Sequence, residues 1–243
     1  MNLEFIWSAL PLYASALILT VRIALVVIVL SLALGLVCSL ILYQQGGKSG
    51  EKSGKSGEKI GEKSGKARWL RVLAKLVRGY IELARNTPLL IQLFFLYYAL
   101  PKLGLMLSNE ECAIIGLAFL GGGYMAESFR SGLEGVGRVQ LEQGLSLGLR
   151  PLQLIRFVIF PQAIALAIPA LGANCIFLIK ETSVVSIIAL RDLMSVTKEL
   201  IGMYYNTVES LFLLVICYLL VLIPVSFLLI FIERKTRYAE FGV

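Results

Sequence analysis

The stretch IALVVIVLSLALGLVCSLILY, from Ile23 to Tyr43, holds no charged residue over 21 positions. A second stretch, from Leu211 to Ile232, holds none over 22 positions. Because a helix needs about 20 apolar residues to cross the hydrocarbon core of a bilayer, each stretch is long enough to span a membrane. The whole chain of 243 residues is 58% hydrophobic and only 16% charged. The sequence therefore predicts an integral membrane protein.

Three further apolar stretches contain charges or prolines, and they lie at Tyr80–Leu100, Cys112–Phe129 and Phe157–Ile179. Charges and prolines inside a membrane span are tolerated where neighbouring protein or water satisfies them. We therefore expect an all-α, polytopic membrane protein. About five transmembrane helices would pack as one bundle, in a single domain over residues 1–243.

Lys and Arg are concentrated in alternate connections between these stretches. If the N-terminus lies outside the cell, residues 44–79, 130–156 and 233–243 face the cytoplasm and hold 17 of the 23 basic residues. Cytoplasmic connections are the ones enriched in Lys and Arg. The sequence thus predicts an N-terminus outside and a C-terminus in the cytoplasm.

Residues 46–66 consist almost entirely of Gly, Ser, Lys and Glu. They include Gly50-x-x-x-Gly54-Lys55-Ser56, one residue short of a nucleotide phosphate-binding loop. Such a loop needs a buried strand before it and a helix after it, and neither is indicated here. We expect a flexible cytoplasmic loop. The charge of residues 48–78 is +7, which is a topology signal and would also suit anionic lipid headgroups.

Several classes of site are disfavoured by composition. The chain has no His, which removes the commonest metal ligand and the usual base at neutral pH. Its four Cys residues lie in four different apolar stretches and are interpreted as core residues: Cys38, Cys112, Cys175 and Cys217. No metal site and no catalytic residue is expected.

The connection VQLEQGLSLGLRPLQLIRFVIFPQAI, from Val139 to Ile164, is amphipathic and too long for a tight turn. Glu142, near the start of a short helix, would interact favourably with the helix dipole, and Gly148 would allow that helix to end. Pro151 would start the next segment. We interpret residues 139–161 as a surface for a partner.

This connection resembles the signature of the membrane permease subunits of ABC importers. That signature reads Glu-Ala-Ala, three residues, Gly, nine residues, Ile-x-Leu-Pro. The same spacing is found here, although the two alanines, Ile and Leu are replaced. Three other stretches resemble the polar amino acid branch of the family: Tyr80–Pro101, Gly122–Val136 and Ile168–Ile188.

The resemblance implies the fold of a type I importer permease in the cell inner membrane. Two permease subunits, identical or paralogous, would form the pathway. Two cytoplasmic ABC ATPases would use ATP and Mg, and an external binding protein would deliver a polar amino acid such as glutamine, glutamate, histidine or arginine. This chain would bind no cofactor and would not be an enzyme. Its connection would be a coupling loop, whose ATPase-coupling residues would be Glu142, Gln143, Gly144, Gly148 and Pro161.

Polar residues inside the apolar stretches are candidates for the transport pathway. Opposite charges three residues apart share a helical face, so they are also candidates for intramembrane ion pairs. Lys180 and Glu181, at the end of the fourth stretch, are interpreted as snorkelling side chains or as a contact to the binding protein. The pathway candidates are Gln92, Tyr124, Glu127 and Asn174, with interhelical hydrogen bonds as the alternative role, and the candidate pairs are Glu82 with Arg85 and Glu127 with Arg130.

Other classes of membrane protein remain alternatives. A secondary amino acid transporter would need no ATPase, but it often shows an inverted repeat that is not visible here. A membrane-embedded enzyme is disfavoured by the missing His and by the lack of paired intramembrane carboxylates. A membrane anchor or scaffold would not explain the Glu-Gly-Pro spacing.

Overall fold

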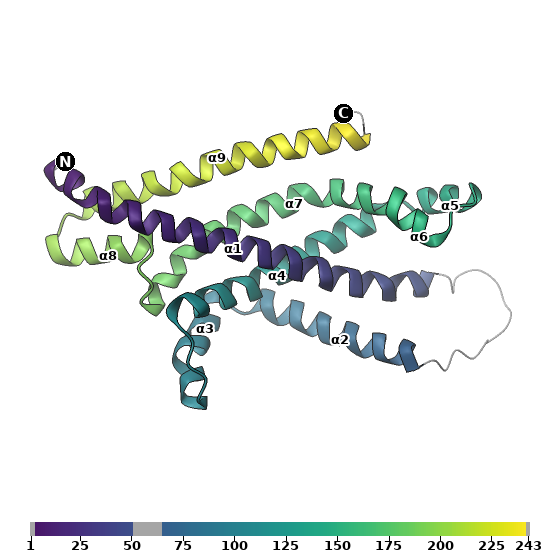
Figure 1. Cartoon of the computed structure of the whole chain (residues 1–243), viewed down its shortest axis with the longest axis horizontal. Helices are drawn as coiled ribbons and strands as arrows, with labels where there is room; N and C mark the ends of the chain where they lie inside the picture. Colours follow the sequence, from purple (N-terminus) through teal and green to yellow (C-terminus); the bar gives the residue numbers. More distant parts are fainter. Residues whose placement is uncertain (1–2, 51–64, 242–243) are drawn as a thin grey trace.

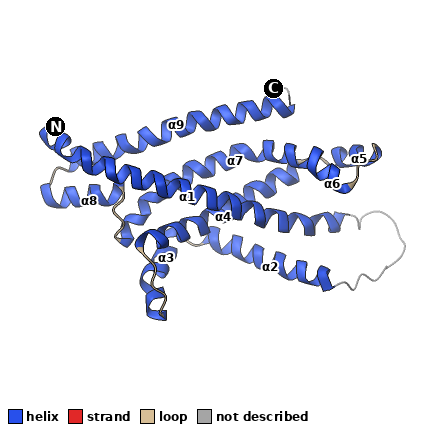
Figure 2. Cartoon of the chain, viewed as in Figure 1, coloured by secondary structure: helices blue, strands red, loops and turns tan. Residues whose placement is uncertain are grey.

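The computed structural model describes residues 3–50 and 65–241, and all regular secondary structure in those residues is helical (Figures 1 and 2). This confirms the predicted all-α class. Four helices there are long and apolar enough to cross a membrane: α1 (Leu3–Gly50), α4 (Asn109–Gly135), α7 (Phe160–Glu181) and α9 (Thr207–Phe241). The shorter helices are α2 (Gly65–Asn86), α3 (Leu89–Phe94), α5 (Arg138–Ser146), α6 (Pro151–Leu154) and α8 (Leu193–Tyr204).

The predicted second span, Tyr80–Leu100, is two helices rather than one. Helix α2 ends at Asn86, Thr87 and Pro88 are not helical, and α3 starts at Leu89. In Figure 1, α3 turns away from the direction of α2. Pro88 explains the break, because proline has no N–H to donate and disfavours a helical conformation of the residue before it. The expected count of five spans therefore becomes four long helices and this broken pair.

Helix α4 is the centre of the bundle, in contact with α1, α2 and α7. Its glycines make this close packing possible. A Cβ on Gly132 would lie 2.3 Å from the carbonyl oxygen of Ala163 in α7. A Cβ on Gly35 of α1 would lie 2.5 Å from the Cβ of Met125 in α4. Because the backbones approach this closely, side chains from α1, α4 and α7 lie near one another.

The ends of the helices separate into two groups (Figure 1). The N-terminus and α8 lie at one end, whereas α5, the C-terminal part of α9 and the facing ends of α1 and α2 lie at the other. The second group contains the connections rich in Lys and Arg, which is the arrangement that the orientation prediction requires. The orientation itself stays a prediction.

The predicted loop over residues 46–66 is shorter than expected. Helix α1 continues through Gly50 and α2 begins at Gly65, so both edges of this segment are helical. Residues 51–64, and with them most of the near-match to a phosphate-binding loop, lie outside the described residues.

Candidate functional site

Helix α5 occupies the predicted coupling loop. Leu147 caps the helix, and Gly148 follows in the left-handed region at φ 75°, with its N–H donating to the Leu145 carbonyl at 2.9 Å. Gly148 thus ends the helix as predicted, because glycine adopts this conformation without strain. The expected place of Glu142 near the helix start was wrong. The helix begins at Arg138, so Glu142 lies at its middle, away from the positive end of its dipole.

The two faces of α5 differ. Gly144 is buried, and a Cβ there would lie 2.3 Å from Cδ1 of Leu154 in α6. Glu142 and Gln143 are exposed, together with the apolar side chains of Val139, Leu145 and Leu147. The replacement of Ala by Gly at position 144 therefore falls on the face that packs against α6. The replacement does not change the outward face of α5.

Pro161 does not belong to the same surface. It is the second residue of α7 and follows a π-helical turn over Ile155–Ile159. Proline lacks the N–H of a regular helix, and such turns are one way that a helix accommodates this defect. Residues 155–161 belong to an apolar helical segment, Ile155–Ile188, that is long enough to span a membrane.

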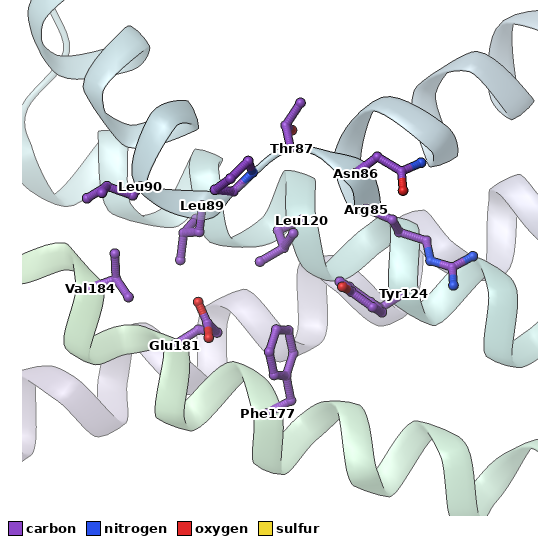
Figure 3. Close-up of a pocket in the computed structure, with 11 residues that line it drawn as sticks. Arg85, Asn86, Thr87, Leu89, Leu90, Leu120, Tyr124, Phe177, Glu181 and Val184 are labelled. Carbon is purple, nitrogen blue, oxygen red and sulfur yellow. The ribbon is translucent and has the colours of Figure 1, made fainter.

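A pocket of about 430 Å³ opens where α2 breaks (Figure 3). Residues from α2, α4 and α7 face it, and they include Arg85, Tyr124 and Glu181. The pocket therefore combines a guanidinium group, a phenol and a carboxylate inside the bundle. Its other lining residues are Asn86, Thr87, Pro88, Leu89, Leu90, Leu120, Phe177 and Val184.

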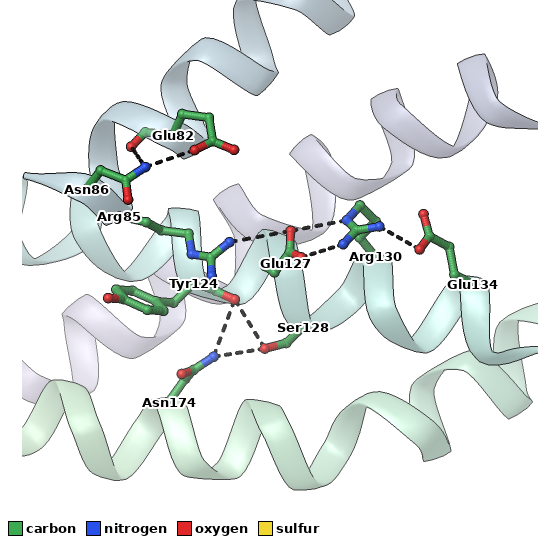
Figure 4. A network of polar contacts seen from close by, with 9 residues as sticks. All are labelled: Glu82, Arg85, Asn86, Tyr124, Glu127, Ser128, Arg130, Glu134 and Asn174. Carbon is green, nitrogen blue, oxygen red and sulfur yellow. Dashed lines mark hydrogen bonds and ion pairs between the residues drawn. The ribbon is translucent and has the colours of Figure 1, made fainter.

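A chain of ion pairs runs beside the pocket (Figure 4). Nη1 of Arg85 lies 3.6 Å from Oε2 of Glu127, and the Arg85 guanidinium also lies over the Tyr124 ring at 5.4 Å. Glu127 accepts two hydrogen bonds from Arg130, one of them from Nε at 3.1 Å. Arg130 also pairs with Glu134 at 2.5 Å. The predicted pair of Glu127 with Arg130 is therefore present.

The other predicted pair, Glu82 with Arg85, is not the arrangement found. Glu82 accepts a hydrogen bond from Nδ2 of Asn86 at 2.8 Å, one turn further along α2. Arg85 is directed to Glu127 of α4 instead. Because α2 packs against α4, a carboxylate of the neighbouring helix is within reach of Arg85.

Asn174 connects α7 to α4. Its Nδ2 donates to Oγ of Ser128 at 2.8 Å and to the Tyr124 carbonyl at 3.3 Å (Figure 4). Asn174 is thus held by interhelical hydrogen bonds, the alternative that the sequence left open. Of the four pathway candidates, Tyr124 lines the pocket, while Glu127 and Asn174 fix the helices around it.

Gln92 forms hydrogen bonds across the break between α2 and α3. Its Nε2 donates to the carbonyls of Ala84 and Thr87, at 3.2 and 3.1 Å, and to Oγ1 of Thr87 at 2.7 Å. These carbonyls lie where Pro88 interrupts the backbone hydrogen bonds. The Gln92 amide therefore supports the pocket wall, and Gln92 itself does not line the pocket.

Comparison with known proteins identifies the family. Residues 64–238 match the model of the binding-protein-dependent transport system inner membrane component family. The chain belongs to this family. It is a multi-pass permease subunit of an inner membrane transporter.

Two relatives of this permease illustrate the similarity. It is 33% identical, over 173 residues, to the nopaline transport system permease protein NocM of Agrobacterium fabrum, covering 67% of this chain and 72% of the relative. It is 31% identical, over 160 residues, to the glutamine transport system permease protein GlnP of Escherichia coli K12, covering 65% of this chain and 73% of the relative.

The fold of the permease is shared with solved transporters. The crystal structure of an amino acid ABC transporter with histidines contains a chain with a TM-score of 0.81 and 27% identity, covering 97% of the permease and 99% of that chain. The MetNI methionine ABC transporter gives a TM-score of 0.71 at 18% identity, covering 97% and 99%. At that identity the second similarity concerns the fold alone.

Of the residues that line the pocket, only Tyr124 was among the predicted pathway candidates. Glu181 was expected, together with Lys180, to snorkel or to contact the binding protein. In the structure Lys180 is exposed, whereas Glu181 is half-buried and lines the pocket (Figure 3). The sequence signal for Glu181 was only its charge at the end of an apolar stretch.

Proposed function

We propose that this permease forms the membrane pathway of an ATP-driven importer that moves a polar amino acid into the cytoplasm. The relatives support the substrate class, because their names refer to nopaline and glutamine transport. The observation that carries the proposal is the open pocket at the break between α2 and α3, whose mostly apolar lining includes the charged groups of Arg85 and Glu181. In a membrane bundle, charged and polar groups around a cavity are typical of a substrate pathway.

The size and charge of the pocket suit a free amino acid. Its volume of about 430 Å³ is within the range of small-molecule sites. The pocket offers groups of both signs, Arg85 from α2 and Glu181 from α7. A zwitterion needs both an acceptor for its ammonium group and a donor for its carboxylate, and these two walls supply them.

Helix α5 is the proposed docking element for the ATPase. Its outward face combines Glu142 and Gln143 with three apolar side chains that are exposed at the end of the bundle: Val139, Leu145 and Leu147. Exposed apolar groups rimmed by polar ones are typical of a protein interface. Gly148, which ends the helix, would set the direction in which the chain leaves this interface.

The same helix is mechanically connected to the pocket. Gly144 of α5 packs on Leu154 of α6, and the chain continues through the π-helical turn into α7. Helix α7 carries Phe177 and Glu181 of the pocket. If an ATPase moved α5, the movement would be transmitted along α7 to the pocket. Such transmission is expected where packed helices can adopt two alternative arrangements.

The remaining partners follow from this assignment. Cytoplasmic ABC ATPases would bind ATP and Mg, so this chain would carry no nucleotide and perform no catalysis. An external binding protein would deliver the amino acid. A second permease subunit, identical or paralogous, would complete the pathway, and lipids would surround it.

Charge reversal on α5 tests the proposal. The complex would be purified in mild detergent with its ATPase subunits, reconstituted into liposomes and assayed for ATP-driven amino acid uptake. Glu142→Lys should abolish uptake or release the ATPase while the protein still inserts into the membrane. Glu4→Lys is the matched control, because Glu4 is an exposed acid in the first turn of α1, and the N-terminus lies at the end of the bundle opposite α5 (Figure 1). Full ATP-driven uptake by Glu142→Lys would contradict the role of α5.

A further inference from the structure

Helix α2 has three faces that differ in chemistry. The face that packs against α1 and α4 is buried and uncharged, and it consists of Ala74, Val77, Ile81 and Ala84. A second face is exposed and apolar, and it consists of Trp69, Val72, Leu76 and Leu83. A third face is exposed and basic, and it consists of Arg68, Arg71, Lys75 and Arg78. Because residues three, four or seven positions apart share one side of a helix, the exposed sets form an apolar stripe and a basic stripe along α2.

The packing of α2 on α1 places both stripes at the membrane boundary. The start of α2 and the end of α1 lie at the same end of the bundle (Figure 1). Ala74 and Val77 belong to one core cluster with Cys38 and Leu42 of α1. These two α1 residues lie near the end of the uncharged stretch that finishes at Tyr43, where α1 leaves the hydrocarbon core. The basic stripe is therefore level with the lipid headgroups, the depth at which Trp side chains such as that of the apolar stripe are enriched.

The charge of α2 complements an anionic ligand. The helix contains six basic residues and one acidic residue, Glu82, which accepts a hydrogen bond from Asn86 beyond the end of the basic stripe. Guanidinium and ammonium groups are strong donors to phosphate oxygens. The same face of a second copy of this chain would bring like charges together, which is unfavourable. A lipid with a negatively charged headgroup offsets the charge of the basic stripe, and its acyl chains cover the apolar stripe.

We propose that these two stripes of α2 form a binding face for an anionic phospholipid in the leaflet at the α5 end of the bundle. The headgroup phosphate lies on Lys75 and its basic neighbours, and an acyl chain extends along Leu76 and Leu83 toward the centre of the bilayer. This face is separate from the pocket, and its assignment does not depend on the proposed function. Because α2 continues to the break before Pro88, a bound lipid would restrain the helix whose other end forms part of the pocket wall.

Trp69 is a reporter within the proposed face, since the chain has two tryptophans and the other, Trp7, is 73% exposed near the N-terminus. The full chain carrying Trp7→Phe would be reconstituted in vesicles of equal parts phosphatidylglycerol and phosphatidylcholine. One of the two lipids at a time would carry bromine on its acyl chains, which quenches an adjacent indole. Brominated phosphatidylglycerol should associate with Trp69 at least about fivefold more strongly than brominated phosphatidylcholine, since each basic side chain near an anionic surface contributes about this factor.

Two double variants in the same background test the basic stripe. Arg68→Gln with Lys75→Gln should make the quenching by the two lipids nearly equal. Lys102→Gln with Lys180→Gln, which removes the same charge from exposed positions outside α2, should keep the preference. Circular dichroism would check that each variant is helical. Equal quenching by the two lipids in the Trp7→Phe chain overturns the proposal, and so does quenching by neither, because protein would then cover this face. An unchanged preference after Arg68→Gln with Lys75→Gln overturns it as well.

Discussion

Arg85 of α2 and Glu127 of α4 form an ion pair between two helices, with Nη1 3.6 Å from Oε2 (Figure 4). The pair lies beside the pocket, and Glu127 also accepts hydrogen bonds from Arg130 of its own helix. Glu127 therefore joins the broken end of α2 to the central helix of the bundle. The pair thus links two helices that contribute residues to the pocket.

A double-mutant cycle measures this contact. Arg85→Gln and Glu127→Gln should show a coupling energy of roughly 0.5 to 1 kcal/mol, because the side chains are 36% and 33% exposed and solvent weakens their attraction. Glu127→Gln should be the more destabilising single change, because Glu127 has two cationic partners. Thermal unfolding in detergent is the measurement. Strictly additive effects of the two changes would argue against an energetic role for the pair.

Gln92 should be essential to the α2–α3 break. Gln92→Ala removes the donor that serves the Ala84 and Thr87 carbonyls, and we expect a loss of about 2 kcal/mol in stability. Ile91→Ala is the matched control, because Ile91 is 58% exposed on the same helix. Unfolding of both variants in detergent would be compared. Equal stability of the two variants would show that the Gln92 hydrogen bonds contribute nothing.

Replacement of glycine by alanine should have opposite effects on stability at two positions. Gly132→Ala places a Cβ 2.3 Å from the Ala163 carbonyl oxygen, so α4 and α7 must separate, at a cost of about 3 kcal/mol. Gly79→Ala meets no atom within 4 Å and should stabilise α2 by about 0.5 to 1 kcal/mol. Expression level and thermal unfolding of the two variants are the measurements. A Gly132→Ala protein as stable as the wild type would contradict the close packing of these helices.

Asp192 should make stability depend on pH. It is fully buried at the start of α8, where it accepts hydrogen bonds from the N–H groups of Met194 and Ser195, and burial raises its pKa from 3.8 to about 6. The folded protein therefore holds this proton more tightly than the unfolded chain does. Stability should fall by at most about 3 kcal/mol as pH rises from 4 to 6.

Asp192→Asn provides the comparison for that pH dependence. Asparagine keeps a capping oxygen but does not titrate. The difference in unfolding free energy between wild type and Asp192→Asn should change between pH 4 and pH 6, with the wild type losing stability relative to the variant. A difference that stays constant with pH would mean that Asp192 has an ordinary pKa.

The uninterrupted apolar stretches were predicted well from sequence, because about 20 apolar residues in a row have few alternatives to a membrane helix. The N-terminal part of α1 was missed because Arg22 interrupts the apolar run. In the structure Arg22 pairs with Glu110 of α4 at 2.5 Å, and the helix continues past it to Leu3. A charge satisfied by a distant partner cannot be distinguished, in sequence, from a charge that ends a span.

The candidate site was predictable only in part. The spacing of Glu142 and Gly148 predicted a short helix that Gly148 ends, although α5 starts earlier than expected, at Arg138. The three-residue spacing of Glu127 and Arg130 predicted their pair, because that contact depends on local helix geometry. The position of Glu181 at a pocket was not predicted, because it depends on how α7 packs against α4. The partner of Arg85 likewise came from another helix, which spacing along the chain cannot show.

ATP-dependent accumulation is the most direct test of the central claim. The permease would be reconstituted in liposomes with its ATPase and binding protein, and uptake of a labelled polar amino acid would be followed with ATP, without ATP and with an ion gradient alone. The proposed function predicts accumulation against a concentration gradient only when ATP is hydrolysed. Accumulation driven by an ion gradient without ATP would identify a secondary transporter and contradict the proposed function.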